Sequence, residues 1–114
     1  LANGGVGKNG ARILASASVK LLTSPSLGKE LLPFFEYSHN VGYDYGLGVR
    51  VMRDPAKAGS LVPSGAFGWD GKKMCLTISD PVNRIAIFHA ESVDGMNSIV
   101  IPRLTNVIYS CFDD

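Results

Sequence analysis

The chain has 114 residues, which is enough for one domain, residues 1–114, with a modest hydrophobic core. Its 46% hydrophobic content is typical of a globular protein and excludes a disordered one. Eleven basic and ten acidic residues leave a formal net charge of +1, so we expect neither nucleic acid nor an anionic membrane surface as a partner.

The first quarter of the chain predicts a loop followed by a short helix. Residues 3–10 hold four glycines and two asparagines, which favour turns. Ser16 is a candidate cap for a helix from about Ala17 to Leu22, and Pro25 would end it. Residues 26–42 are expected to be irregular.

The start of the chain leaves its localisation unknown, cytoplasmic or exported. Leu1 is not a methionine, and the residues after it contain neither the basic region nor the apolar core of a signal peptide. They resemble the end of a helix that runs into a loop, so we expect that an upstream segment has been removed. No apolar run approaches the ~20 residues needed to cross a bilayer, and no membrane segment is predicted.

Three strands are predicted in the second half of the chain. Tyr43 to Met52 alternates in hydrophobicity, Gly68 to Ser79 forms the second strand, and Arg84 to Ala90 forms the third. Residues 53–65 are a long polar connection. The turn Asp80-Pro81-Val82-Asn83 is short enough to make the last two strands an antiparallel hairpin.

A helix is predicted at the C-terminal end. Pro102 suits the first turn of a helix, so we expect the helix to begin near Ile101. Its apolar stripe follows helical spacing and would lie across the sheet. The sequence therefore predicts an α+β fold: a three-stranded antiparallel sheet, a C-terminal helix packed on it and a short N-terminal helix. The residues of the stripe are Leu104, Val107, Ile108, Cys111 and Phe112.

The cysteines and histidines give no sign of a metal or a cofactor. Cys75 and Cys111 fall in apolar patterns, which favours two buried free thiols over a disulfide. His39 and His89 are far apart and have no second ligand at a metal-like spacing. We therefore expect no metal and no cofactor.

Other motifs of catalysis fail on spacing or context. Ser38 and His39 are adjacent, and adjacent residues rarely orient as nucleophile and base. The glycines at Gly4 to Gly7 do not match a phosphate-binding loop. Three aspartates lie in turn contexts, where local hydrogen bonding is sufficient explanation: Asp44, Asp54 and Asp80.

The segment from Ala66 to Lys72 is the most informative one. It contains Trp69-Asp70-Gly71 between two strand-like runs. A glycine there allows close approach of a ligand, and the tryptophan offers a broad amphipathic face. The alternative is a bend at the start of a strand with the tryptophan packed on the core. Lys72 and Lys73 should point to opposite faces and so cannot clamp one anion together.

The order of several segments resembles the later part of β-lactamase-related serine hydrolases, and the resemblance spans nearly the whole chain. Phe67-Gly68-Trp69-Asp70-Gly71 matches the position of that family's third motif, which is Lys-Thr-Gly in many β-lactamases and Trp-x-Gly in related carboxylesterases. The other matching segments are Leu1 to Gly5, Gly10 to Leu14, Ser18 to Thr23, Tyr45 to Val51, Asp80-Pro81 and the closing helix.

The resemblance implies an enzyme that hydrolyses an ester or a lactam through an acyl-serine. A lysine and a tyrosine would assist the serine. Trp69, Asp70 and Gly71 would form one side of the cleft, and the backbone N–H of Lys72 would supply half of an oxyanion hole. The resemblance places the family's Ser-x-x-Lys and tyrosine motifs upstream of the segments matched here, so we expect the catalytic residues to lie upstream and this chain alone to be inactive.

Lys72-Lys73-Met74-Cys75 departs from the small residues that often follow Trp-x-Gly in related esterases. This departure motivates an alternative, a binding or structural module derived from the same fold. A third reading is an α+β interaction domain unrelated to hydrolases. Loss of upstream strands would leave an open sheet edge, so we also expect self-association or pairing with the missing N-terminal segment.

Overall fold

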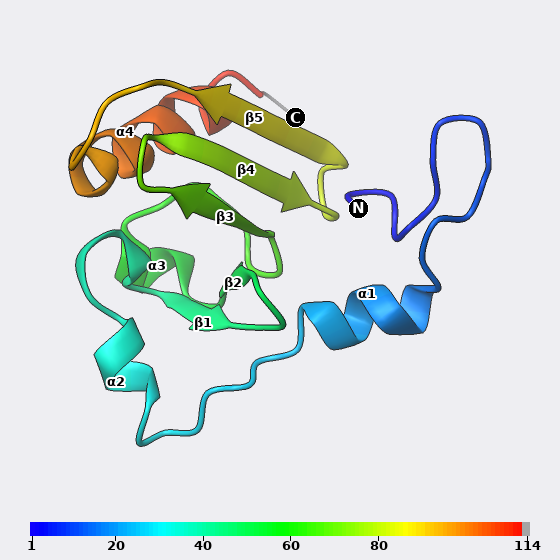
Figure 1. The fold of residues 1–114 in the computed structure, drawn as a ribbon, viewed down its shortest axis with the longest axis horizontal. Helices are drawn as coiled ribbons and strands as arrows, with labels where there is room; N and C mark the ends of the chain where they lie inside the picture. Colours follow the sequence, from blue (N-terminus) through cyan, green and yellow to red (C-terminus); the bar gives the residue numbers. More distant parts are fainter. Residues whose placement is uncertain (113–114) are drawn as a thin grey trace.

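The computed structural model describes residues 1–112 and shows an α+β fold built on one five-stranded antiparallel sheet (Figure 1). The strands lie side by side in chain order, and the last two connections are short turns. The strands are β1 (Tyr43–Tyr45), β2 (Arg50–Met52), β3 (Phe67–Gly71), β4 (Cys75–Asp80) and β5 (Ile85–Ala90).

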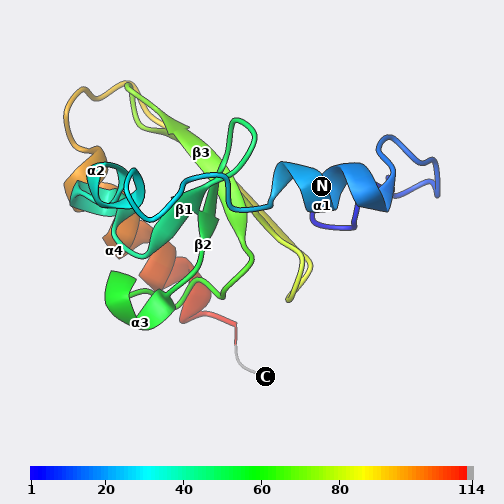
Figure 2. The ribbon, with the colours of Figure 1, turned by 90° about the horizontal axis from the view of Figure 1, so that it is seen from below.

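One face of the sheet is covered by α4 (Asn97–Tyr109), as Figures 1 and 2 show. The other helical segments lie at the sides: α1 (Ser16–Leu22), α2 (Leu32–Phe35), the 3₁₀ turn η1 (Ser38–Asn40) and α3 (Pro55–Ala58). Helix α1 extends away from the sheet and buries none of its residues (Figure 2). None of the helices within residues 1–112 is long and apolar enough to span a membrane.

The hydrophobic core lies between the sheet and α4. Leu76 and Ile78 alternate along β4 with the exposed Cys75 and Thr77, because successive side chains of a strand point to opposite faces. Ile101 of α4 packs into the same cluster. The core is therefore one-sided: α4 covers one face of β4 and β5, and the opposite face of these strands is exposed.

The expected three-stranded sheet is wrong in strand number, because two of the predicted strands are hairpins. The run from Tyr43 to Met52 folds back as β1 and β2, and the run from Gly68 to Ser79 folds back as β3 and β4. Alternation continues through the first reversal, and residues 72–74 at the second contain no proline, asparagine or glycine to mark a turn, so the local pattern does not reveal them. The third strand and the turn that precedes it are confirmed as β5 and residues 81–84.

A close approach of two backbones fixes the first hairpin. A Cβ on Gly46 would overlap the carbonyl oxygen of Leu22 at the end of α1. The Leu47 N–H donates to that same oxygen at 2.9 Å. The position therefore requires glycine, and the contact attaches α1 to the β1–β2 hairpin.

The two predicted helices form, with differences at their ends. Helix α1 has the expected extent, but Ala15 occupies the N-cap position and Ser16 makes no capping bond. Helix α4 begins at Asn97, four residues before the predicted start, so Pro102 lies inside it. Proline removes only one intrahelical hydrogen bond so near the helix start, which keeps the cost low.

The buried stripe of α4 also differs from the predicted one. Ile101, Thr105 and Tyr109 are buried, whereas Val107 and Cys111 are exposed. Cys75 is exposed too, because its side chain lies on the uncovered face of β4. Both cysteines are free, as predicted, but the expectation that they are buried is wrong.

Candidate functional site at the end of strand β3

The predicted site residues at the end of β3 lie on two different faces of the sheet. Trp69 lies on the open face and Asp70 on the face toward α4, since neighbouring strand residues alternate. Strand β2 pairs with β3 only at Phe67 and Gly68, so Trp69 to Gly71 extend beyond it. The four predicted residues are therefore contiguous along the strand, but they face different surroundings.

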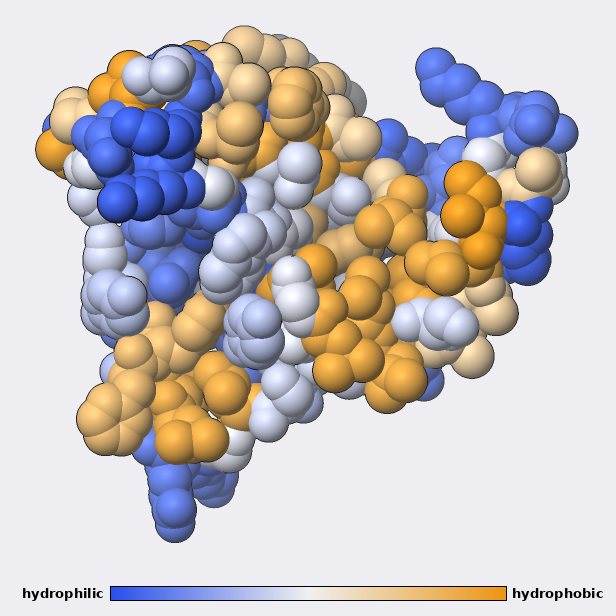
Figure 3. Space-filling model, viewed as in Figure 1, coloured by the Kyte–Doolittle hydropathy of each residue, from blue (hydrophilic) through white to orange (hydrophobic). Residues whose placement is uncertain are grey.

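Trp69 belongs to an apolar surface and is not part of the core, which corrects the alternative expectation for this residue. Its side chain is 43% exposed and meets the ring of Tyr45 edge to face, with centroids 5.6 Å apart. The rings of Tyr45 and Phe35 make a second contact of this kind, also at 5.6 Å. A hollow here is lined by Leu27, Leu31, Phe34, Phe35, Tyr45 and Trp69. Hydrophobic surface gathers around α2 and between the sheet and α1 in Figure 3.

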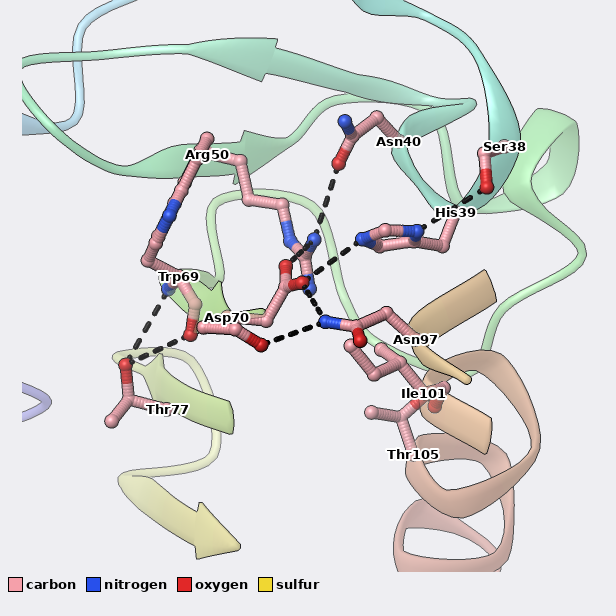
Figure 4. A network of polar contacts seen from close by, with 11 residues as sticks. Ser38, His39, Asn40, Arg50, Trp69, Asp70, Thr77, Asn97, Ile101 and Thr105 are labelled. Carbon is pink, nitrogen blue, oxygen red and sulfur yellow. Dashed lines mark hydrogen bonds and ion pairs between the residues drawn. The ribbon is translucent and has the colours of Figure 1, made fainter. Parts of the chain in front are cut away.

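Asp70 lies at the centre of a polar network (Figure 4). Its carboxylate pairs with the guanidinium of Arg50, accepts from the Nδ2 of Asn97 at 2.6 Å and contacts the Nε2 of His39 at 3.1 Å. Arg50 also donates to the Oδ1 of Asn40 at 3.1 Å. Four segments far apart in the sequence thus meet at one carboxylate: η1, β2, β3 and the first residue of α4.

The surroundings of Asp70 keep its carboxylate ionised. Burial, which leaves only 9% of the side chain exposed, raises the pKa. The hydrogen bond from His39, the charge of Arg50 and the hydrogen bond from Asn97 act in the opposite direction and outweigh it. The pKa of Asp70 is therefore below its ordinary value. An ionised Asp70 is a hydrogen-bond acceptor.

Ser38 and His39 face each other, although adjacent residues were not expected to do so. The Ser38 Oγ lies 3.4 Å from the His39 Nδ1, on the opposite side of the ring from Asp70 (Figure 4). Ser38 has a left-handed backbone with φ of 56°, which is uncommon for a residue other than glycine. This conformation brings the two neighbouring side chains together.

The backbone N–H of Lys72 lies at the first position of the β3–β4 turn. The turn is closed by the Met74 N–H, which donates to the Gly71 carbonyl at 3.1 Å. No acceptor for the Lys72 N–H is found among residues 1–112. The side chain of Lys72 lines a hollow with His39 and Asn97, whereas Lys73 pairs with the exposed Asp94 at 3.3 Å.

The remaining candidates have local roles. The Oδ1 of Asp54 accepts from the Lys57 N–H at the start of α3, and Asp44 accepts from the Tyr45 N–H. Asp80 accepts from two backbone N–H groups of its turn and from the hydroxyl of Tyr109 at 3.0 Å. The local explanation is confirmed for Asp54. Asp44 lies inside β1, so its predicted turn context is wrong, and Asp80 adds a long-range bond to α4 to its local ones. No group of three potential metal ligands occurs in the part of the chain that the structure describes.

His89 and Tyr109 each bond to a carboxylate. The Nε2 of His89 lies 2.9 Å from the Oε1 of Glu91, two residues further along the chain. Burial, followed by the hydrogen bond to Asp80 and the charge of Asp80, raises the pKa of Tyr109. Its hydroxyl therefore stays protonated and joins α4 to the β4–β5 turn.

The partners of Asp70 are the residues that sequence reasoning missed. Arg50 gave the clearest signal, because an arginine within an apolar strand needs a buried acceptor. Gly68 lies opposite Arg50 in the sheet and has no side chain to compete for the same space. Nothing in the spacing of His39 and Asn97 connects them with Asp70.

Comparison with known proteins does not assign a family: no family model and no curated protein sequence matches this chain.

Proposed function

We propose that the chain is the C-terminal part of a β-lactamase-like serine hydrolase domain, which cleaves an ester or a lactam through an acyl-serine. The observation that carries the proposal is the end of β3, where an exposed Trp69 is followed within three residues by the unpaired N–H of Lys72. The partial β-lactamase-like fold is part of the same proposal, supported by the antiparallel sheet with a C-terminal helix on one face.

The chemical role follows from the geometry of the turn. A backbone N–H at the tip of a rigid hairpin is held in place before the reaction, so it can stabilise a developing oxyanion without reorganisation. A donor of this kind contributes about 3 kcal/mol to transition-state stabilisation. The nucleophilic serine, with its own N–H and its lysine and tyrosine partners, would come from a segment that precedes Leu1.

The uncovered surfaces support pairing with such a segment. Phe88 on the open face of β5 is 75% exposed, and Trp69 lies on the same face. Helix α1 has seven residues and buries none of them, and so short a helix is not stable without packing. A segment that covers the open face and α1 would bury this apolar surface. Without it, we expect the chain to self-associate.

A non-catalytic binding or structural module is the second candidate. The observation in its favour is the turn itself, where Met74 is fully buried with a left-handed φ of 62°. Lys72 and Lys73 place two long side chains beside the proposed oxyanion donor. If these side chains block the cleft, the fold would keep its sheet and lose its activity.

The experiment compares the chain with a longer protein that includes the region encoded before Leu1. Turnover of a chromogenic cephalosporin and of p-nitrophenyl esters is measured for both, and we expect saturable turnover only for the longer protein. An inactive longer protein whose segment before Leu1 lacks a Ser-x-x-Lys motif would favour the non-catalytic module. Saturable cephalosporin turnover by the 114-residue chain would contradict the assignment of the nucleophile to another segment.

A pair of variants at one position tests the oxyanion donor. In the longer protein, Lys72→Pro removes the N–H, and proline is tolerated at the first position of many turns. We expect a fall in kcat of roughly 100-fold or more. Lys72→Ala keeps the N–H and removes only the side chain, so its kcat should stay close to the original value. Equal losses in both variants would exclude the backbone donor.

A further inference from the structure

A second feature of the site is independent of the Trp69 surface: a hydroxyl, an imidazole and a carboxylate form a continuous chain. Ser38, His39 and Asp70 are joined by contacts of 3.4 Å and 3.1 Å (Figure 4). The order is that of a nucleophile, a base and an orienting acid. The carboxylate lies 31 residues away from the histidine in the sequence, so this order arises only in the folded chain.

The hydrogen bonds fix which nitrogen of His39 is the base. Asp70 is ionised and can only accept, so the Nε2 that faces it carries the proton. In the neutral ring the Nδ1 is then the acceptor, and this is the nitrogen that faces the Ser38 hydroxyl. The tautomer required to take a proton from Ser38 is therefore the one that Asp70 imposes.

Asp70 is itself held by groups that do not touch Ser38. Arg50, with a side chain only 3% exposed, and Asn97 both bind the carboxylate. Asn97 also donates to the Gly71 carbonyl at 2.9 Å, which ties the carboxylate to the β3–β4 turn. The imidazole is thus oriented by a rigid, buried support, whereas the hydroxyl at the other end of the chain is exposed.

The exposed end of this chain opens into a hollow that can accept a small acyl group. Ser38 and His39 line it together with Lys72 and Ser98. A cationic residue in this lining favours the negative charge that develops on a carbonyl oxygen under attack. Asp94, which also lines the hollow, is paired with Lys73.

The geometry points to Ser38 as an activated hydroxyl that is acylated by small activated acyl esters. In the step, the Ser38 Oγ forms a bond to the acyl carbon while the bond from that carbon to the leaving oxygen breaks. The Ser38 proton passes to the His39 Nδ1 and then to the leaving group, so no oxidant or other reactant is needed. The product is one acyl group per chain, a modification that is distinct from turnover at the Trp69 surface.

The test uses the 114-residue chain with p-nitrophenyl acetate and, separately, a fluorophosphonate probe. Released p-nitrophenolate gives the rate, and peptide mass mapping locates the adduct. We expect one acetyl or phosphonyl group per chain on Ser38. Ser38→Gly should abolish the adduct, and glycine suits the left-handed backbone there, so this variant should remain folded.

Two further variants test whether Ser38 reacts because His39 activates it or only because its hydroxyl is exposed. His39→Gln keeps a polar side chain without a base, and we expect its acylation rate to fall roughly 100-fold. Ser92→Ala removes an exposed hydroxyl outside the hollow and should leave the rate unchanged. Adducts on Lys72 or Lys73 alone, or equal rates for His39→Gln and the original chain, would overturn the proposal. These outcomes leave the proposed hydrolase function untouched, because its test relies on the longer protein.

Discussion

The two faces of the sheet are built from the same strands but differ in what covers them. On the α4 side, Leu76 is fully buried and the polar groups around Asp70 are matched by partners. On the open side, Phe88 is 75% exposed and Trp69 is 43% exposed. The comparison teaches that the same strands pack against a helix on one face and leave apolar side chains in contact with solvent on the other.

The largest loss of stability should follow from removing the cation of the polar network on the covered face. Arg50→Ala leaves the Asp70 carboxylate buried without its main counter-charge. Removing one partner of a buried ion pair costs about 3–5 kcal/mol, so we expect the free energy of unfolding to fall by this amount. Urea unfolding followed by circular dichroism measures it. A loss near zero would mean that the carboxylate is solvated and that the network is not structural.

A cavity in the apolar part of the same face should have the next largest effect. Leu76→Ala removes a fully buried side chain between β4 and α4. We expect a loss of about 2–4 kcal/mol, from lost transfer free energy and from the cavity. The same unfolding measurement applies. A loss below about 1 kcal/mol would mean that α4 is not tightly packed on β4.

Acid should lower the free energy of unfolding by protonating Asp70 in the polar network of the covered face. The pKa of Asp70 is lowered in the folded chain, so its carboxylate stabilises the fold above the unfolded pKa of about 3.9. That contribution is lost as the pH falls through the lower, folded value. Unfolding free energies measured from pH 7 to pH 3 should decline more steeply for the original chain than for Asp70→Asn. Parallel curves would show that another carboxylate dominates.

The smallest effect is expected on the open face. Phe88→Ser removes an aromatic side chain that is mostly exposed, so the unfolding free energy should change by less than about 0.5 kcal/mol. The same change should reduce self-association in sedimentation velocity, because it removes apolar surface from the uncovered face. A chain that is a sharp monomer at high concentration before the substitution would contradict the predicted self-association.

Much of the fold follows from local patterns that sequence can read. Strand β5, the turn before it, helix α1 and the existence of α4 were predicted because periodicity and turn residues specify them locally. The hairpins within Tyr43 to Met52 and Gly68 to Ser79 were missed because alternation continues across the first reversal and no proline, asparagine or glycine marks residues 72–74 at the second. The start of α4 was misplaced because Pro102 was assigned to the first turn, whereas the helix has five residues before it.

The candidate site was predicted only along one strand. Trp69 to Lys72 is contiguous in the sequence, so these residues could be singled out without a structure. The opposite orientations of Trp69 and Asp70 follow from strand alternation once the strand is known. What sequence reasoning could not supply is the set of groups that meet at Asp70, because they come from distant segments.

The sequence by itself thus determined the α+β class, the β5 hairpin turn and the motif at the end of β3, because these depend on neighbours within a few residues. Tertiary structure alone decided that Arg50, His39 and Asn97 converge on Asp70 and that Ser38 faces the free nitrogen of His39. The physical reason is that a buried carboxylate must find its partners in space, and the folding of β2, η1 and α4 around β3 brings them there.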